Sequence, residues 1–280
     1  MSDAGKLARG MLAATHPAPA AMVTLFALAL ALRVDPEAGR ALLVTVTVGA
    51  GQLSIGWSND WLDAARDRQV GRLDKPTVRG AVTAATLRTG AFVAAAVSVV
   101  LGFAAGAGAG LANLGVVLGG WTYNLWFKRT ALSWLPYAVA FGLLPVFVVA
   151  AAGDGRSAPG WMVLAGALLG VGAHVANVLP DLEDDRATGV HGLPHRLGRR
   201  GASVVAPLVL AAGCLVTMTG PPGGPSAATV GLTAVAGLLA VAAGALGLLR
   251  PRSRAPFLLS MAVAALCVVQ IVVAGAAVTG

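Results

Sequence analysis

The sequence predicts an all-α integral membrane protein whose nine transmembrane helices form two related halves. Hydrophobic residues make up 57% of the 280 residues and charged residues only 11%, a composition outside the range of soluble globular domains. Apolar stretches of membrane-spanning length recur along the whole chain. An acidic motif near residue 60 recurs near residue 180, and such a repeat predicts an internally duplicated fold.

The nine expected spans form a single transmembrane domain over residues 1–280, preceded by a cytoplasmic tail at 1–16. They run near 17–34, 39–58, 81–105, 107–124, 134–152, 160–179, 203–219, 227–249 and 256–278. A Gly-rich run separates the third span from the fourth, and the long uncharged stretch around it requires two passes. The tail carries Lys6 and Arg9 but no cleavage region, so the first apolar stretch is expected to remain as a span.

The distribution of basic residues predicts the orientation in the cell membrane. With a cytoplasmic N-terminus and nine spans, only Arg33, Arg40 and Arg156 of the 20 lysines and arginines fall outside. Cytoplasmic loops are the ones enriched in lysine and arginine, so the C-terminus is expected outside. The formal net charge of +8 then reflects topology and contact with anionic membrane lipid. Nucleic acid is not an expected partner.

The acidic motif supplies the candidate site. Asn59, Asp63 and Asp67 are spaced i, i+4, i+8, which on a helix stacks three polar side chains along one face over about 12 Å. The pattern recurs 118 residues later, and the identity continues beyond the acids. The seven matching residues of the second copy are Asn177, Asp181, Asp185, Arg186, Gly189, Pro194 and Gly198. Four passes separate the copies, so both are expected at the cytoplasmic end, where the active site would lie.

Two facing carboxylate clusters would offer the hard oxygen ligands that Mg²⁺ prefers, completed by phosphate oxygens of a substrate. Cations follow both clusters, and cations beside a carboxylate-bound metal fit a diphosphate ligand. Most of these cations could instead anchor the protein at the inner leaflet of the membrane. The acids could instead cap helices and pair with nearby arginines. Lys128 is favoured as a ligand contact because Tyr123 precedes it at a helix end. The neighbouring cations are Arg72, Lys75, Arg79, Arg129, Arg186, Arg196 and Arg199.

These segments resemble the UbiA superfamily of intramembrane prenyltransferases. NDWLDAARD, followed by DKPTVRG, resembles the first Asp-rich motif of that family and its trailing segment. NVLPDLEDD resembles the second Asp-rich motif. YNLWFK resembles the Tyr/Lys element between them, with a spacing one residue longer than the commonest form. The resemblance covers nearly the whole chain, including the order of the nine spans.

The resemblance implies a helix bundle around a central cavity that opens sideways to lipid. It also implies Mg²⁺-dependent transfer of a prenyl group from a prenyl diphosphate to a lipophilic, often aromatic, acceptor. One metal would be held by the first motif and another by the second, with Asn177 in the position that matches Asn59. The catalytic residues that the resemblance implies are Asp63, Asp67, Asp181, Asp185 and Lys128. The implied diphosphate-binding residues are Asn59, Arg72, Lys128, Tyr123 and Asn177. The implied metal ligands are Asn59, Asp63, Asp67, Asp181 and Asp185.

Two other functional classes use similar features. A terpene cyclase on the same scaffold needs the same diphosphate machinery but no acceptor pocket. The chain offers few polar groups that would orient an acceptor, namely Gln52, Ser54, Ser58, Asn124 and His174. His174 is interpreted either as an acceptor contact or as a packed, hydrogen-bonded core residue. A transporter also uses repeats and polar groups at membrane depth, but repeated acidic triads with trailing cations favour phosphate chemistry.

Overall fold

The computed structural model describes residues 3–187, 189–250 and 252–275, and every element within them is helical. The long helices are α2 (Pro17–Val34), α3 (Ala38–Gln69), α4 (Ala84–Ala104), α5 (Ala107–Leu125), α6 (Leu135–Ala150), α7 (Gly160–Val178), α9 (Leu193–Thr219), α10 (Ala227–Leu249) and α11 (Ala255–Ala274). The short ones are α1 (Asp3–Ala13), the 3-10 turn η1 (Phe127–Arg129) and α8 (Leu182–Ala187).

Each of the nine predicted spans coincides with one long helix, which confirms the all-α membrane class. Seven of these helices, within the described residues, are long and apolar enough to cross a membrane: α2, α3, α4, α7, α9, α10 and α11. Helix α6 is apolar but has only 16 residues. Helix α5 is not among the seven, and several glycines together with Asn113 and Asn124 make it less apolar. The ninth span was predicted to reach residue 278, and its last residues lie outside the described part of the chain.

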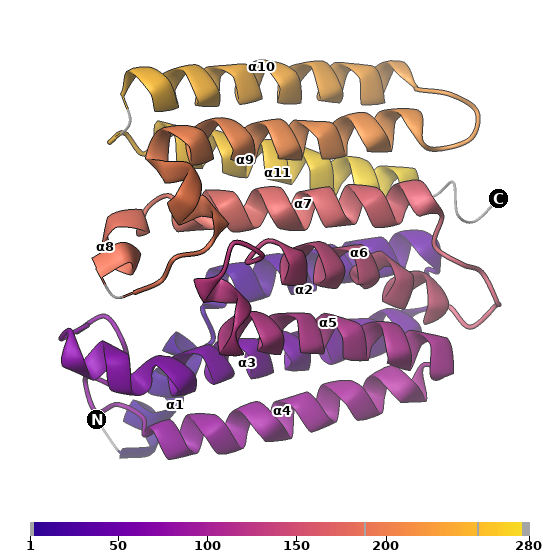
Figure 1. The fold of residues 1–280 in the computed structure, drawn as a ribbon. Helices are drawn as coiled ribbons and strands as arrows, with labels where there is room; N and C mark the ends of the chain where they lie inside the picture. Colours follow the sequence, from indigo (N-terminus) through magenta and orange to yellow (C-terminus); the bar gives the residue numbers. More distant parts are fainter. Residues whose placement is uncertain (1–2, 188, 251, 276–280) are drawn as a thin grey trace.

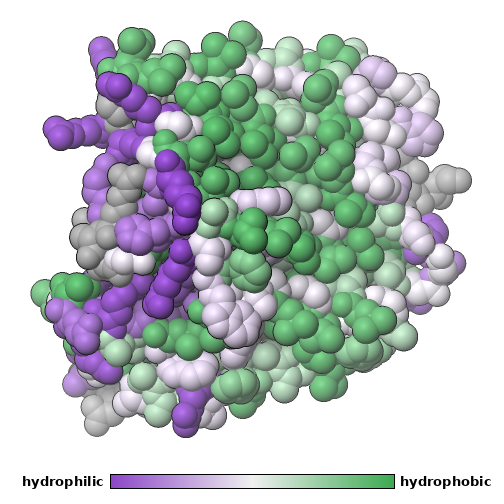
Figure 2. All heavy atoms as spheres, in the orientation of Figure 1, coloured by the Kyte–Doolittle hydropathy of each residue, from purple (hydrophilic) through white to green (hydrophobic). Residues whose placement is uncertain are grey.

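The helices form a closed bundle. Each long helix packs against the next one along the chain, and α11 packs back against α2 and α7. Figure 1 shows α1, α8 and the loops after α3 and α5 gathered at one end, which we call the motif end. Hydrophilic side chains concentrate at that end in Figure 2, while apolar atoms form a broad band across the middle. This distribution is typical of a protein that spans a membrane.

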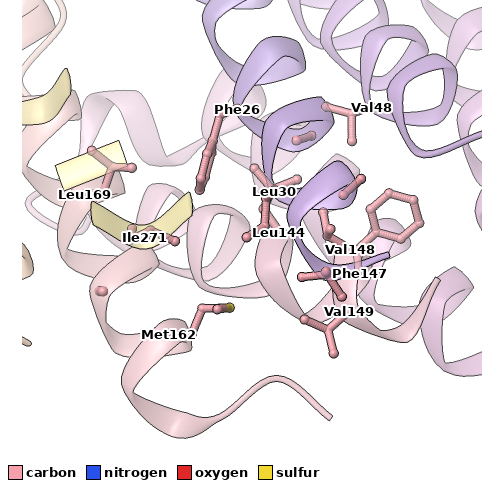
Figure 3. Packing of buried hydrophobic residues seen from close by; sticks show 14 of the residues in the cluster. Phe26, Leu30, Val48, Leu144, Phe147, Val148, Val149, Met162, Leu169 and Ile271 are labelled. Carbon is pink, nitrogen blue, oxygen red and sulfur yellow. The ribbon is translucent and has the colours of Figure 1, made fainter. Parts of the chain in front are cut away.

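The apolar core lies toward the end of the bundle opposite the motif end, and Figure 3 shows part of its packing from close by. Its largest members come from α2, α6, α7 and α11: Phe26, Leu30, Leu144, Phe147, Met162 and Ile271. Glycines bring the helices close together here. A Cβ added at Gly166 or Gly170 would lie 2.4 Å from a backbone oxygen of α6, so α6 and α7 are in direct backbone contact. The predicted central cavity stays a prediction.

The N-terminal segment, which was expected to be a cytoplasmic tail, is helical and packs against the bundle. Residues 3–13 form helix α1, and the indole Nε1 of Trp57 donates a hydrogen bond to the Met11 carbonyl at 2.9 Å. Ala14 is fully buried in a small cluster with Val82 and Leu87. The apolar residues of this segment attach it to α3 and α4.

The internal repeat is visible in the backbone. Gly71 and its counterpart Gly189 have φ of 68° and 79°. Gly80 and its counterpart Gly198 both have φ of 69°. Positive φ is readily adopted only by glycine, so the repeated glycines have a conformational reason. This confirms two related halves, each with an acidic motif followed by a glycine-marked loop.

Candidate active site

The first motif occupies the last turns of α3, which runs without interruption from Ala38 to Gln69. Asp63 and Asp67 are buried and Asn59 is half-buried. The amide nitrogen Nδ2 of Asn59 lies 3.5 Å from Oδ1 of Asp60. The predicted helical stacking of Asn59, Asp63 and Asp67 is therefore confirmed, and the continuous α3 delivers all three to the motif end.

Asp63 is held by two cations. Lys128 Nζ donates to Asp63 Oδ1 at 2.6 Å, and Arg66 Nη2 lies 3.1 Å from Oδ2. The side chains of Lys128 and Asp63 are each only 6% exposed. Burial lowers the pKa of Lys128, and the Asp63 carboxylate opposes that shift. Lys128 projects from η1, directly after α5, so it is a buried partner of the first motif and not an anchor in the lipid leaflet.

Asp67 and Arg66 carry polar atoms that the described residues leave unsatisfied. Asp67 Oδ1 is 3.4 Å from Arg66 Nη2, whereas its Oδ2 is buried without a hydrogen-bond partner. Nε and Nη1 of Arg66 are also buried without a hydrogen-bond partner. Buried polar atoms without partners are costly. A carboxylate oxygen of this kind suits a hard cation, and guanidinium nitrogens suit an anionic oxygen, so the residues present fit Mg²⁺ with a phosphate ligand.

The second motif is not a continuous helix, and the prediction of a single helical face is wrong here. Helix α7 ends at Val178, so Asn177 belongs to its last turn, Asp181 lies in the following turn and Asp185 lies in α8. Pro180 has no N–H for the helical ladder, which accounts for the break. Asn177 and Asp181 are exposed, and Asp185 is half-buried.

Helix α8 is attached to α9 at two points. Asp185 Oδ2 is 3.5 Å from Nε2 of the buried His195, and Arg199 Nε donates to Glu183 Oε1 at 2.8 Å. Burial raises the pKa of Asp185, and the neighbouring His195 opposes that shift. The second carboxylate cluster therefore depends on α9 for its placement.

The backbone around the two motifs is nevertheless equivalent. The Asp67 carbonyl accepts a hydrogen bond from Arg72 N at 3.0 Å, and the Asp185 carbonyl accepts one from Val190 N at 3.0 Å. Both pairs stand at the offset of 118 residues. The chain thus turns in the same way after each motif although the helices that lead into them differ.

Arg72 links the two halves electrostatically. Its guanidinium is paired with Asp74, with Nη2 2.7 Å from Oδ2. Asp74, together with Asp67 and Asp181, raises the pKa of Arg72 well above its usual range. Arg72 is thus the predicted diphosphate-binding cation that is influenced by an acid of each motif.

Tyr123 also lies within electrostatic range of both motifs, through Asp63 and Asp185. Its ring makes edge contacts with Tyr137, at 4.9 Å between centroids, and with His174, at 5.4 Å. His174 is buried, stacks on Tyr137 and has Nε2 2.9 Å from Ser133 Oγ. The structure therefore favours the packed, hydrogen-bonded interpretation of His174.

The predicted metal ligands do not form a closed metal site by themselves. Within the described part of the chain, no three His, Cys, Asp or Glu side chains lie close enough to hold an ion. Mg²⁺ sites commonly combine one or two carboxylates with substrate phosphate oxygens. The predicted set of Asn59, Asp63, Asp67, Asp181 and Asp185 stays a prediction, and it requires a substrate to complete the coordination.

Sequence reasoning gave no site role to Arg66, His16 or His195. Arg66 follows Asp63 by one helical turn, a spacing that predicts pairing. His16 Nε2 is 3.1 Å from Oδ1 of the buried Asp60, whose other partner is Lys75 Nζ at 2.7 Å. Nothing in the sequence connects position 16 with position 60. Among the other predicted cations, Arg129 and Arg196 are exposed, and the side chain of Arg186 lies outside the described residues.

The fold and the site together define a multi-pass membrane protein with a carboxylate- and cation-lined site at one end of its bundle. The chain belongs to the UbiA prenyltransferase family, whose family model matches residues 20–266. It is therefore a member of a family of prenyltransferases.

Solved structures share this fold. A UbiA homologue from Archaeoglobus fulgidus bound to DMAPP and Mg²⁺ is 16% identical, with a TM-score of 0.72 over 96% of this chain and 98% of that chain. An apo UbiA homologue from Aeropyrum pernix K1 is 24% identical, with a TM-score of 0.70 over 89% and 97%. A digeranylgeranylglyceryl phosphate synthase is 15% identical, with a TM-score of 0.68 over 96% and 99%. No match was found among curated proteins.

Proposed function

We propose that the protein uses Mg²⁺ to transfer a prenyl group from a prenyl diphosphate to a lipophilic, aromatic acceptor inside the membrane. The observation that carries this proposal is the buried cluster of Asp63, Asp67, Arg66 and Lys128 at the motif end. It combines acceptors for a hard cation with donors for phosphate oxygens. Membership of the UbiA family and the DMAPP and Mg²⁺ bound by the Archaeoglobus fulgidus homologue support it.

The residues divide the diphosphate chemistry between them. Asn59, Asp63 and Asp67 would hold one Mg²⁺, and Asp181 with Asp185 another. When bound, Mg²⁺ would neutralise the negative charge that develops on the leaving diphosphate as the allylic C–O bond breaks.

The chain's own cations add to this. Lys128 and Arg66 present an ammonium and a guanidinium to phosphate oxygens from the side of the first motif, and Arg72 does so between the motifs. These groups are already ordered by their carboxylate partners, so they stabilise the leaving group without reorganisation. A site within the membrane would keep water away from a prenyl cation, and the ring of Tyr123 would stabilise its positive charge.

One observation favours a terpene cyclase as a second candidate. Polar groups that would orient an acceptor are used in helix packing: Ser54 Oγ donates to the Ala91 carbonyl at 2.8 Å, and Asn124 Nδ2 donates to the Ile55 carbonyl at 2.9 Å. Ser58 Oγ is bonded to the same Ile55 carbonyl at 2.9 Å. A cyclase needs no separate acceptor, because the double bonds of its substrate capture the cation.

Incubation of the purified protein with Mg²⁺ and prenyl diphosphates of several lengths, without acceptor, separates the two candidates. A transferase is expected to leave the substrate largely intact until a lipophilic aromatic acceptor is added. A cyclic hydrocarbon or alcohol formed without acceptor would contradict prenyl transfer and support the cyclase. The product analysis is by gas chromatography with mass spectrometry.

We further propose that the motif end faces the cytoplasm, because nearly all basic residues lie at that end. A cysteine introduced at the exposed His191, in the loop after α8, should then react with a membrane-impermeant thiol reagent only in inverted membranes. A cysteine at the exposed Ser157, in the loop after α6, should show the opposite result. Native Cys214 and Cys267 are buried and give little background. Labelling of position 191 from the external face would contradict the proposed orientation.

A further inference from the structure

His195 stands apart from the other histidines of the chain because it is buried and faces an acid of the second motif. Its exposed fraction is 3%, and its Nε2 lies 3.5 Å from Asp185 Oδ2. At 3.5 Å the two atoms are in ion-pair contact, and a buried imidazole in contact with a carboxylate limits the positions that the carboxylate can adopt. His191, in the loop that precedes α9, is exposed and provides a natural comparison.

Asp185 needs such a restraint because its own helix gives it little support. Helix α8 has only six residues, and helices of this length are not stable by themselves. Leu182 is buried, while Asp181 and Glu183 on either side of it are exposed. The contact with α9 therefore contributes to the orientation of the Asp185 carboxylate.

The start of α9 is held firmly in place. Leu193 N donates to Ser133 Oγ at 2.8 Å, and that oxygen is also 2.9 Å from His174 Nε2. A Cβ added at Gly192 would lie 2.8 Å from Ser133 Oγ and 3.0 Å from the Lys128 carbonyl oxygen. These contacts attach the segment that carries His195 to the loop that carries Lys128, so His195 projects from a fixed backbone.

The contact has no equivalent in the first half. The repeat-related position of His195 is Thr77, at the same offset of 118 residues. Thr77 Oγ1 is buried and has no hydrogen-bond partner among the described residues, and the same is true of Asp67 Oδ2. The continuous helix α3 places Asp67, whereas the broken second motif has a histidine beside Asp185.

We infer that His195 is a positioning residue, which orients the Asp185 carboxylate so that the second motif can bind its metal ion. The inference rests on the proposed function, since it assigns Mg²⁺ to Asp185. Partners that orient metal-binding carboxylates contribute about 10-fold to 100-fold to metal affinity. His195→Thr, which installs the residue of the first half, should therefore weaken Mg²⁺ binding at the second motif.

The test is calorimetric binding of inorganic pyrophosphate to the full-length protein in detergent, at increasing Mg²⁺ concentrations. For His195→Thr and His195→Asn, the Mg²⁺ concentration that gives half-maximal binding should rise by about 10-fold or more. His195→Gln keeps an N–H donor near the position of Nε2 and should stay within about 3-fold of the unaltered protein. His191→Thr should leave the midpoint unchanged.

A purely structural role would lower the melting temperature equally with and without Mg²⁺ and leave the Mg²⁺ midpoint unmoved. An unchanged midpoint in His195→Thr or in His195→Asn would overturn the inference while leaving the proposed function intact. Absence of Mg²⁺-dependent pyrophosphate binding by the unaltered protein would overturn the proposed function and this inference with it.

Discussion

Asp63→Asn and Asp181→Asn are each expected to lower turnover on the order of 10²-fold to 10³-fold, the loss found when one group that stabilises developing charge is removed. Each substitution removes a carboxylate from one side of the proposed diphosphate site and leaves leaving-group charge uncompensated. Asp181 is exposed, so its replacement should affect catalysis without affecting folding. The measurement is turnover at saturating prenyl diphosphate and Mg²⁺.

The double variant provides the sharper part of this prediction. If both acids serve one diphosphate, their losses should be non-additive, because residues that act as a unit cannot each be lost twice. Higher Mg²⁺ should partly rescue each single variant where the damage is to metal affinity. Asp154→Asn, at an exposed position at the opposite end, is the matched control. Near-normal turnover of either single variant would show that one motif alone builds the site.

Lys128→Met is the second large prediction, and it concerns both stability and binding. The Lys128–Asp63 pair is buried on both sides, and removal of one partner from a buried ion pair is destabilising, here by less than the about 3–5 kcal/mol of an isolated pair because Arg66 remains beside Asp63. We therefore expect a lower melting temperature in addition to weaker binding of prenyl diphosphate. The double variant Asp63→Asn/Lys128→Met should recover stability but not activity, because the ammonium and the carboxylate are removed together and Arg66 keeps Asp67 as a partner.

The neighbouring cation Arg129 is the control for Lys128. Arg129 is exposed, and Arg129→Ala should change neither the melting temperature nor the KM for prenyl diphosphate. A Lys128→Met protein that is destabilised but has unaltered kinetics would restrict Lys128 to a structural role. The two readouts thus separate the ion pair from the phosphate contact.

The features that the sequence predicted well are those with a strong local signal. Hydropathy located all nine long helices because each span must be apolar over most of its length. The repeat of Gly71 as Gly189 and of Gly80 as Gly198 predicted equivalent loops, and positive φ at all four positions gives the physical reason. The spacing of Asn59, Asp63 and Asp67 predicted one helical face, and α3 has it.

The features that the sequence did not predict depend on tertiary contacts or on a local break. The second motif has the same spacing as the first, yet Pro180 ends the helical ladder and places Asp181 in a turn. The pairing of Lys128 with Asp63 joins two helices, and that of His195 with Asp185 joins segments on either side of a turn. No periodicity within one element reports such contacts.

The measurement that tests the central claim most directly is the stoichiometry of Mn²⁺, used in place of Mg²⁺, bound with inorganic pyrophosphate. Electron paramagnetic resonance of the free ion gives this number for the unaltered protein, Asp63→Asn and Asp181→Asn. If the two motifs share one diphosphate, the unaltered protein should bind two Mn²⁺ ions in the presence of pyrophosphate. Each variant should bind one ion fewer. Unchanged stoichiometry and affinity in either variant would contradict a site built jointly by the two motifs.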